Sequence, residues 1–293
     1  MTSSDSVAAM PRDFAALLEL EPHGADTFVG LSPPYDWGRI FGGQVIAQAL
    51  SAAAATVPAE RIVHSLHAYF ILGGRPDEPV RYEVDRVRNG RSFMTRRVVA
   101  RQSYGAILTL EASFHLDEPG PDIETVRPPK GLRTPDGLTE QGWGWILQRR
   151  ELPTTPGAGR ALTWVRADDS IGDDPVRHAC ALAFATDTGT VSAVRALHPK
   201  GGSGEWNNEV FMGASLDHAV WFLRPVRADR WLLIDVNTDS LTGVRGLTIG
   251  RVFDDEGRHV ATFTQEALLR ERAETGQERE PTVTAPPRRR GSR

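Results

Sequence analysis

The chain has 293 residues, which is long enough for two domains of ordinary size, each with its own core. Hydrophobic residues make up 40%, charged residues 25%, and the formal net charge is -4, so composition offers no basic surface for nucleic acid. The single cysteine, Cys180, cannot form an internal disulfide, and no N-terminal stretch is typical of a signal peptide, so we expect a cytoplasmic protein. The longest apolar run, residues 45–55, is too short to cross a bilayer, so we expect no stable membrane insertion.

A helix followed by antiparallel strands is predicted in the first half of the chain. Residues 43–56 are built from Ala, Leu, Gln, Val and Ile without an internal Pro or Gly, which predicts a helix of about three turns. Residues 80–84 and 106–114 alternate apolar with polar side chains, which is typical of strands with one buried face. Asn89-Gly90 predicts a tight turn between strands.

The same order of elements returns after about 150 residues, which we interpret as an internal duplication. Asp174-Pro175 predicts a helix start, because an acidic cap and a proline in the first turn both favour one. An apolar stripe at helical spacing follows over residues 176–184. Alternating patterns then predict a second set of strands at 215–222, 231–237, 245–253 and 260–269.

Two copies of a helix followed by a curved antiparallel sheet predict an α+β protein in which each sheet covers a helix. We expect one unit at 13–116, a Pro- and Gly-rich connection at 117–159, a second unit at 160–270 and a disordered tail at 271–293. The two sheets can join edge to edge, which removes two exposed edges and creates a seam that accommodates a long apolar ligand.

Common catalytic signatures fail in this sequence. Residues 213–217 come near the nucleophile elbow of α/β hydrolases, but they end in Asp where that turn needs Gly, and they lead into a strand pattern. His64 and His67 are three residues apart on a predicted strand, which sends them to opposite faces and argues against a shared metal. We therefore expect no metal.

Two polar residues occupy positions where the pattern predicts apolar ones. Asp187 continues the apolar stripe of the second helix, so its carboxylate either needs a buried partner or caps a helix that has already ended in solvent. Gln265 falls on the inward face of a strand where the first copy has Leu110. It is either part of a polar site or a satisfied core glutamine.

Several strings carry a family resemblance that extends over residues 29–270. They are Gly38–Leu50 (GRIFGGQVIAQAL), His64–Phe70 (HSLHAYF), Asn89–Phe93 (NGRSF), Leu216–Phe222 (LDHAVWF) and Thr264-Gln265-Glu266. In this order they resemble the type II acyl-CoA thioesterases. The resemblance implies a double hotdog fold, in which each of two fused units is a long helix wrapped by a curved antiparallel sheet.

The resemblance also implies hydrolysis of acyl-CoA without a metal or an organic cofactor. In that family an acid, a hydroxyl and an amide orient a water molecule, and by position these are Asp187, Ser215 and Gln265. Many relatives carry Thr where this chain has Ser215, a change that keeps the hydroxyl. We expect medium- or long-chain fatty acyl-CoA as the substrate, because two apolar helices should line the seam.

Further candidates concern the oxyanion and the substrate channel. Backbone amides at the helix start, at Gly43 or Gln44, are candidate oxyanion donors, although this glycine pair also permits close packing. His64 and His67 are interpreted as core or substrate-channel histidines. A homodimer or homotetramer is expected, because the outer faces of fused sheets commonly pair.

Two other functions compete with this interpretation. A hotdog hydratase or dehydratase acting on enoyl or hydroxyacyl thioesters needs an Asp/His pair, but Asp217 and His218 are adjacent on a strand and should point opposite ways. A non-catalytic acyl-CoA-binding module should have lost one of the three polar residues, and all three are present.

Overall fold

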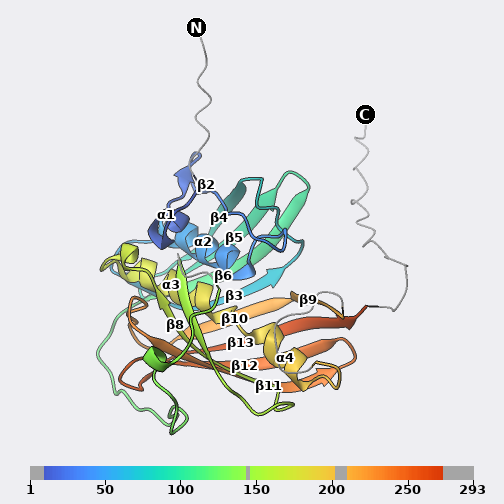
Figure 1. Cartoon of the computed structure of the whole chain (residues 1–293). Coiled ribbons are helices and arrows are strands. Elements are labelled where there is room, and N and C mark those ends of the chain that lie inside the picture. The colour runs from blue at the N-terminus through green and yellow to red at the C-terminus, as the bar shows by residue number, and fades with distance from the viewer. Residues whose placement is uncertain (1–9, 143–145, 202–209, 273–293) are drawn as a thin grey trace.

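The computed structural model describes residues 10–142, 146–201 and 210–272. Two units lie one above the other, the N-terminal one drawn blue to teal and the C-terminal one green to red (Figure 1). Their strands form one 13-stranded sheet in which every paired neighbour is antiparallel. Helices cover its concave inner side, so the predicted α+β double hotdog is confirmed.

The N-terminal unit places one unbroken helix, α2 (Gly42–Ala54), against its own strands, close to the predicted 43–56. A short helix, α1 (Phe14–Leu18), precedes it. The strands are β1 (Glu21–Pro22), β2 (Thr27–Gly30), β3 (Arg61–Phe70), β4 (Val80–Asn89), β5 (Phe93–Gln102) and β6 (Gly105–Leu116). The predicted Asn89-Gly90 turn joins β4 to β5.

The C-terminal unit repeats this order with a different helical part. Its helix α3 (Pro175–Thr186) begins as predicted, with the Asp174 carboxylate accepting a 2.9 Å hydrogen bond from the Val176 N–H. A second helix, α4 (Thr190–Leu197), follows, and short 3-10 turns lie at Pro135–Gly137 and Asp169–Ile171. The strands are β7 (Leu147–Leu152), β8 (Arg160–Ala167), β9 (Phe211–Ser215), β10 (Asp217–Phe222), β11 (Leu232–Thr242), β12 (Arg245–Phe253) and β13 (His259–Glu271).

The expectation that each helix lies across its own sheet is wrong in part for the second unit. There α3 packs mainly against α2 at the seam, and α4 covers the C-terminal strands instead. Gly189, at a φ of +80°, adopts the left-handed conformation that ends one helix and starts the next. The break leaves Asp187 as the C-cap of α3, between the two helices.

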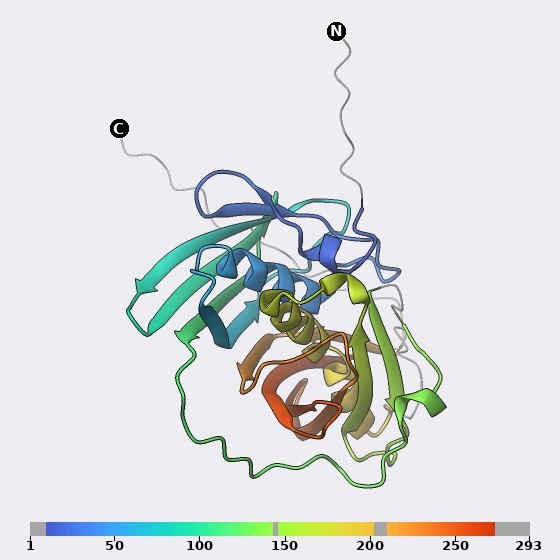
Figure 2. The ribbon, with the colours of Figure 1, turned by 90° about the vertical axis from the view of Figure 1, so that its left-hand side faces the viewer.

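The two sheets join edge to edge, as predicted, through antiparallel pairing of β3 with β10. Figure 2 shows α2 and α3 side by side on the inner side of this junction. The helices approach closely because position 43 is glycine: a Cβ there would lie 2.4 Å from the Phe184 carbonyl oxygen. The seam between the units is therefore built from both the central strand pair and the two helices.

The boundaries of the second unit differ from the expected ones. Residues 147–152, within the predicted connection 117–159, form β7, which pairs with β8 at the edge of the sheet. This strand was missed because its sequence, LQRREL, is largely polar, as an edge strand allows. The first part of the connection, after β6, runs around the outside of the molecule (Figure 2). Glu271 still belongs to β13, and most of the predicted tail, residues 273–293, lies outside the described residues.

Candidate active site

Three side chains predicted to act together meet where α3 ends. The Ser215 hydroxyl donates to Asp187 Oδ1 at 3.0 Å, and Gln265 Nε2 donates to Ser215 Oγ at 2.8 Å. These residues come from the α3 C-cap, the end of β9 and the inner face of β13. Their predicted convergence is thus found in the fold, and their roles in catalysis stay a prediction.

Asp187 combines the two interpretations that the sequence left open. It is a helix cap, and it is also buried, with 7% of its surface exposed. Its Oδ2 accepts a 2.8 Å hydrogen bond from the Gly43 N–H of α2, a helix whose N-cap residue, Phe41, offers no side-chain cap. The carboxylate from one unit therefore satisfies the helix N-terminus of the other, where negative charge is favoured.

The environment makes Asp187 a stronger base than an ordinary aspartate. Burial raises its pKa from 3.8 to about 6, and hydrogen bonds from Ser215, Gly43 and Gln265 oppose that rise. The surroundings include aromatic rings: a Cβ on Gly42 would lie 2.7 Å from Asp187 Oδ2 and 2.8 Å from the Phe70 ring. A carboxylate with a pKa of about 6 is ionised at neutral pH yet accepts a proton readily.

An irregularity between β9 and β10 turns Ser215 inward. Ser215 lies opposite Ala267 of β13, whereas Ala219 lies opposite Thr264, so one extra residue separates the two stretches. Such a bulge lets Ser215 and His218, three residues apart, both face the helices. Strict alternation along a single predicted strand would have sent them to opposite faces.

Sequence reasoning missed the residues that hold Gln265. Its Oε1 lies 2.7 Å from His218 Nδ1, and its Nε2 also donates to Thr190 Oγ1 at 2.6 Å. His218 Nε2 lies 2.9 Å from Thr186 Oγ1. Burial lowers the pKa of His218 to about 4, so the ring is neutral near pH 7. A signal did exist, because His218 stands where the first copy has Ala68.

The candidate oxyanion donors have other partners in this structure. The Gly43 N–H donates to Asp187, and the Gln44 N–H donates to the Phe41 carbonyl at 3.1 Å. The Gln44 side chain is fully buried and bonds Tyr35 and Ser32 in the core. Neither N–H is therefore free to meet an oxyanion in this arrangement, and Gln44 is a core residue.

His64 and His67 lie away from the three polar residues. His67 stacks edge-on against Trp221 on the outer face of the sheet, and His64 Nε2 is 2.7 Å from Ser113 Oγ on that same face. The prediction of opposite faces is wrong, because a register shift between Val63 and Ser65 turns His64 outward as well.

In residues 10–142, 146–201 and 210–272, no three His, Cys, Asp or Glu side chains gather as a metal site would require. No helix of that part of the chain has the length and apolar character to span a bilayer.

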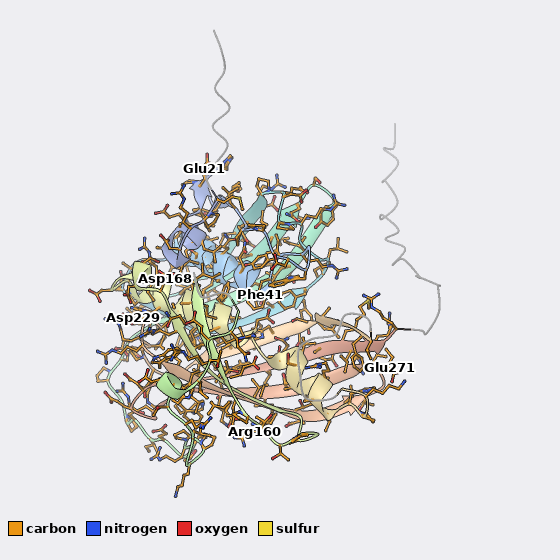
Figure 3. The ribbon with its side chains drawn as sticks, in the orientation of Figure 1. Glu21, Phe41, Arg160, Asp168, Asp229 and Glu271 are labelled. Atoms are coloured by element: carbon orange, nitrogen blue, oxygen red, sulfur yellow. The ribbon has the colours of Figure 1, made fainter. Side chains whose placement is uncertain are left out.

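Figure 3 labels Phe41, which precedes α2 and lies between the units. The Phe41 ring is 4.9 Å from the ring of Phe184.

Comparisons with known proteins cover nearly the whole folded part. The family described as acyl-CoA thioesterase N-terminal domain matches residues 31–115, and acyl-CoA thioesterase C-terminal domain matches residues 111–269. Human acyl-coenzyme A thioesterase 8 is 33% identical over 285 residues, which is 87% of this chain and 88% of that protein. Acyl-CoA thioesterase 2 of Haemophilus influenzae is 30% identical over 279 residues, 87% of this chain and 96% of that protein.

A solved structure supports the same comparison. Acyl-CoA thioesterase II TesB2 from Mycobacterium marinum is similar with a TM-score of 0.75 and 34% identity, and the match covers 90% of this chain and 99% of that one.

Proposed function

Because this chain belongs to the type II acyl-CoA thioesterases and hydrolyses acyl-CoA thioesters, we propose that Asp187 activates a water molecule that attacks the thioester carbon. The observation that carries this proposal is a buried carboxylate with a pKa of about 6, hydrogen-bonded to Ser215, which is in turn bonded to Gln265. A general base works best when its pKa lies near the working pH.

In the proposed reaction the water transfers a proton to Asp187 while the water oxygen bonds to the carbonyl carbon of the thioester. Ser215 and Gln265 orient that water, so its lone pair faces the thioester. When the tetrahedral intermediate collapses, the carbon–sulfur bond breaks and the proton on Asp187 passes to the sulfur of CoA. The products are a free acid and the CoA thiol, and the base contributes about 100- to 10,000-fold to the rate.

The Ser215 hydroxyl donates to Asp187, as the hydroxyl of a catalytic nucleophile would. Gln265 donates to the same oxygen, which occupies a lone pair and weakens it as a nucleophile. We expect Ser215→Ala to lose about 10- to 1,000-fold in turnover by loosening the water. Complete loss together with an acyl-enzyme detected by mass spectrometry of the wild type would instead support a covalent route.

Asp187→Asn tests the assigned base. The amide cannot take the proton, so thiol release from acyl-CoA should fall by about 100- to 10,000-fold while the thermal melt remains cooperative. Asp217→Asn is the matched control, because Asp217 Oδ1 accepts from the Glu266 N–H at 2.7 Å, a hydrogen bond that the oxygen of Asn can also accept. Near-normal turnover by Asp187→Asn would place the base elsewhere.

We propose medium- or long-chain fatty acyl-CoA as the preferred substrate. The support is the apolar character of the two helices at the seam, whose buried residues include Val45, Ile46, Leu182 and Phe184. Release of the free CoA thiol should be measured with saturated acyl-CoAs of about nine chain lengths, from two to eighteen carbons. A preference confined to acetyl-CoA would contradict this assignment without affecting the assignment of Asp187.

The proposal extends to a homodimer or homotetramer in the cytoplasm. Its support is the outer face of the seam, where Tyr69 is 63% and Trp221 is 37% exposed, surface that a second copy of the chain would bury. Light scattering at micromolar concentration should report more than one chain, and a monomeric mass would refute this assembly.

A further inference from the structure

The buried ring of His218 takes no part in the steps above, yet it holds the amide that does. His218 is 1% exposed, and its two ring nitrogens face Gln265 Oε1 at 2.7 Å and Thr186 Oγ1 at 2.9 Å. Thr186 directly precedes Asp187, so this chain of contacts starts and ends beside the carboxylate. His218 thus links the end of α3 to the side chain that contacts Ser215.

Counting donors fixes where the ring carries its hydrogen. Gln265 Oε1 can only accept, so His218 Nδ1 must be the donor. In the neutral ring Nε2 then has a lone pair that faces the Thr186 hydroxyl at 2.9 Å, and the single hydrogen of this hydroxyl is shared between Nε2 and the Ala183 carbonyl oxygen, which also lies at 2.9 Å. On the other side of the amide, both hydrogens of Gln265 Nε2 are engaged, one by Ser215 and one by Thr190.

Rotation of the Gln265 side-chain amide by half a turn about its Cγ–Cδ bond would exchange the positions of Oε1 and Nε2. Its carbonyl oxygen would then face Ser215, whose one hydrogen would be shared between that oxygen and Asp187. Asp187 would lose part of the hydrogen bonding that opposes the effect of burial. The orientation of this amide therefore matters to the base as well as to the water.

We propose that His218 is a positioning residue which, together with Thr186, selects the Gln265 orientation that donates to Ser215. This inference rests on the proposed function of Gln265. It treats His218 as acting through Gln265 rather than on the substrate. The role therefore predicts an effect on turnover and on the pH profile, with little effect on substrate binding.

The test compares His218→Ala with His218→Asn, since Asn places an amide N–H near the position of the ring Nδ1. We expect His218→Ala to lower kcat by about 10- to 100-fold, the factor that corresponds to one buried hydrogen bond, with KM changed by less than about threefold. The acid limb of its kcat/KM profile should move to higher pH. His218→Asn should recover most of kcat, to within about fivefold of the wild type. An unchanged kcat, a stationary acid limb, or an Asn variant no better than Ala would overturn the inference.

A pair of threonines keeps the test decisive if position 218 tolerates no change. Thr186 and Thr188 are both buried, and each hydroxyl lies within hydrogen-bond distance of a carbonyl three residues back, at 2.9 Å and 2.7 Å. Only Thr186 also contacts His218. Thr186→Val should therefore lower kcat and shift the acid limb of the pH profile, whereas Thr188→Val should do neither. Equal effects of the two substitutions would contradict the inference.

Failure of this inference and failure of the proposed function give different results. If Gln265→Ala lowers kcat while a folded His218→Ala does not, only the positioning role is wrong. If Gln265→Ala itself keeps wild-type kcat, the assignment of Gln265 is wrong and the role of His218 falls with it.

Discussion

The same place in the two sheets carries an apolar pair in one unit and a polar pair in the other. Ala68 of β3 lies opposite Leu110 of β6, and continuing the register of Ala219 with Thr264 sets His218 opposite Gln265. Leu110 is 1% exposed and Gln265 is fully buried, so both positions are excluded from solvent. A polar pair is stable in such a position only when its hydrogen-bonding groups find partners, and Ser215, Thr186 and Thr190 supply them.

The helices differ in a complementary way. The helix α2 is continuous but has no side-chain cap at its N-terminus, whereas the second unit's helix is broken and ends in a buried carboxylate. The Asp187–Gly43 hydrogen bond joins these two ends at 2.8 Å. Neither unit alone contains the whole arrangement, so the site depends on the fusion of both units across the seam.

Exchanging the two inner-face residues gives the largest expected effect. Gln265→Leu copies the first unit and removes both N–H donors, so kcat should fall by about 100- to 1,000-fold in a thiol-release assay. The reciprocal variant, Leu110→Gln, buries an amide with no arranged partners. It should lower the free energy of unfolding by about 1–3 kcal/mol and leave kcat within about twofold of the wild type.

A comparable loss of kcat in both variants would mean that packing of the sheet, rather than the amide of Gln265, controls the rate. Urea denaturation of both proteins provides the stability values needed for that comparison.

The buried charge should also make the stability of the fold depend on pH. Because folding raises the pKa of Asp187 from 3.8 to about 6, the folded state favours the protonated acid, and ionisation above pH 6 costs about 3 kcal/mol. The stabilisation of the folded state by protonated Asp187 is fully present below pH 3.8 and is lost as pH rises to about 6. Relative to Asp187→Asn, which cannot ionise, the wild type should therefore become less stable across that window.

Urea unfolding of both proteins at several pH values from 4 to about 7.5 measures this difference. Leu110→Gln, which leaves the carboxylate unchanged, should follow the pH dependence of the wild type. A difference between wild type and Asp187→Asn that stays constant with pH would show that Asp187 is not held in the environment described.

The sequence predicted those parts of the site that break a regular pattern. Asp187 interrupts the apolar stripe of a helix, and Gln265 stands where the first copy has Leu110, so the pattern made both candidates while a helix cap and a core glutamine stayed open as alternatives. Ser215 came only from the family resemblance, because nothing in a strand pattern reveals the bulge that turns it inward. Thr186 and Thr190 were missed because short polar residues at helix ends are common, and their partners lie 32 and 75 residues away in the chain.

The smallest effect, and the most direct report on the base, is the acid limb of kcat/KM. Only the ionised form of Asp187 accepts a proton, so the rate should be half-maximal at about pH 6 and fall about tenfold for each further pH unit. Gln265→Leu removes a hydrogen bond that holds this pKa down, so its limb should move to higher pH, whereas Leu110→Gln should keep the wild-type limb. The acid limb reflects the carboxylate and its partners Ser215, Gly43 and Gln265, and a Gln at position 110 replaces none of these partners. A limb that shifts equally in both variants, or that lies near pH 4, would contradict a buried Asp187 acting as the base.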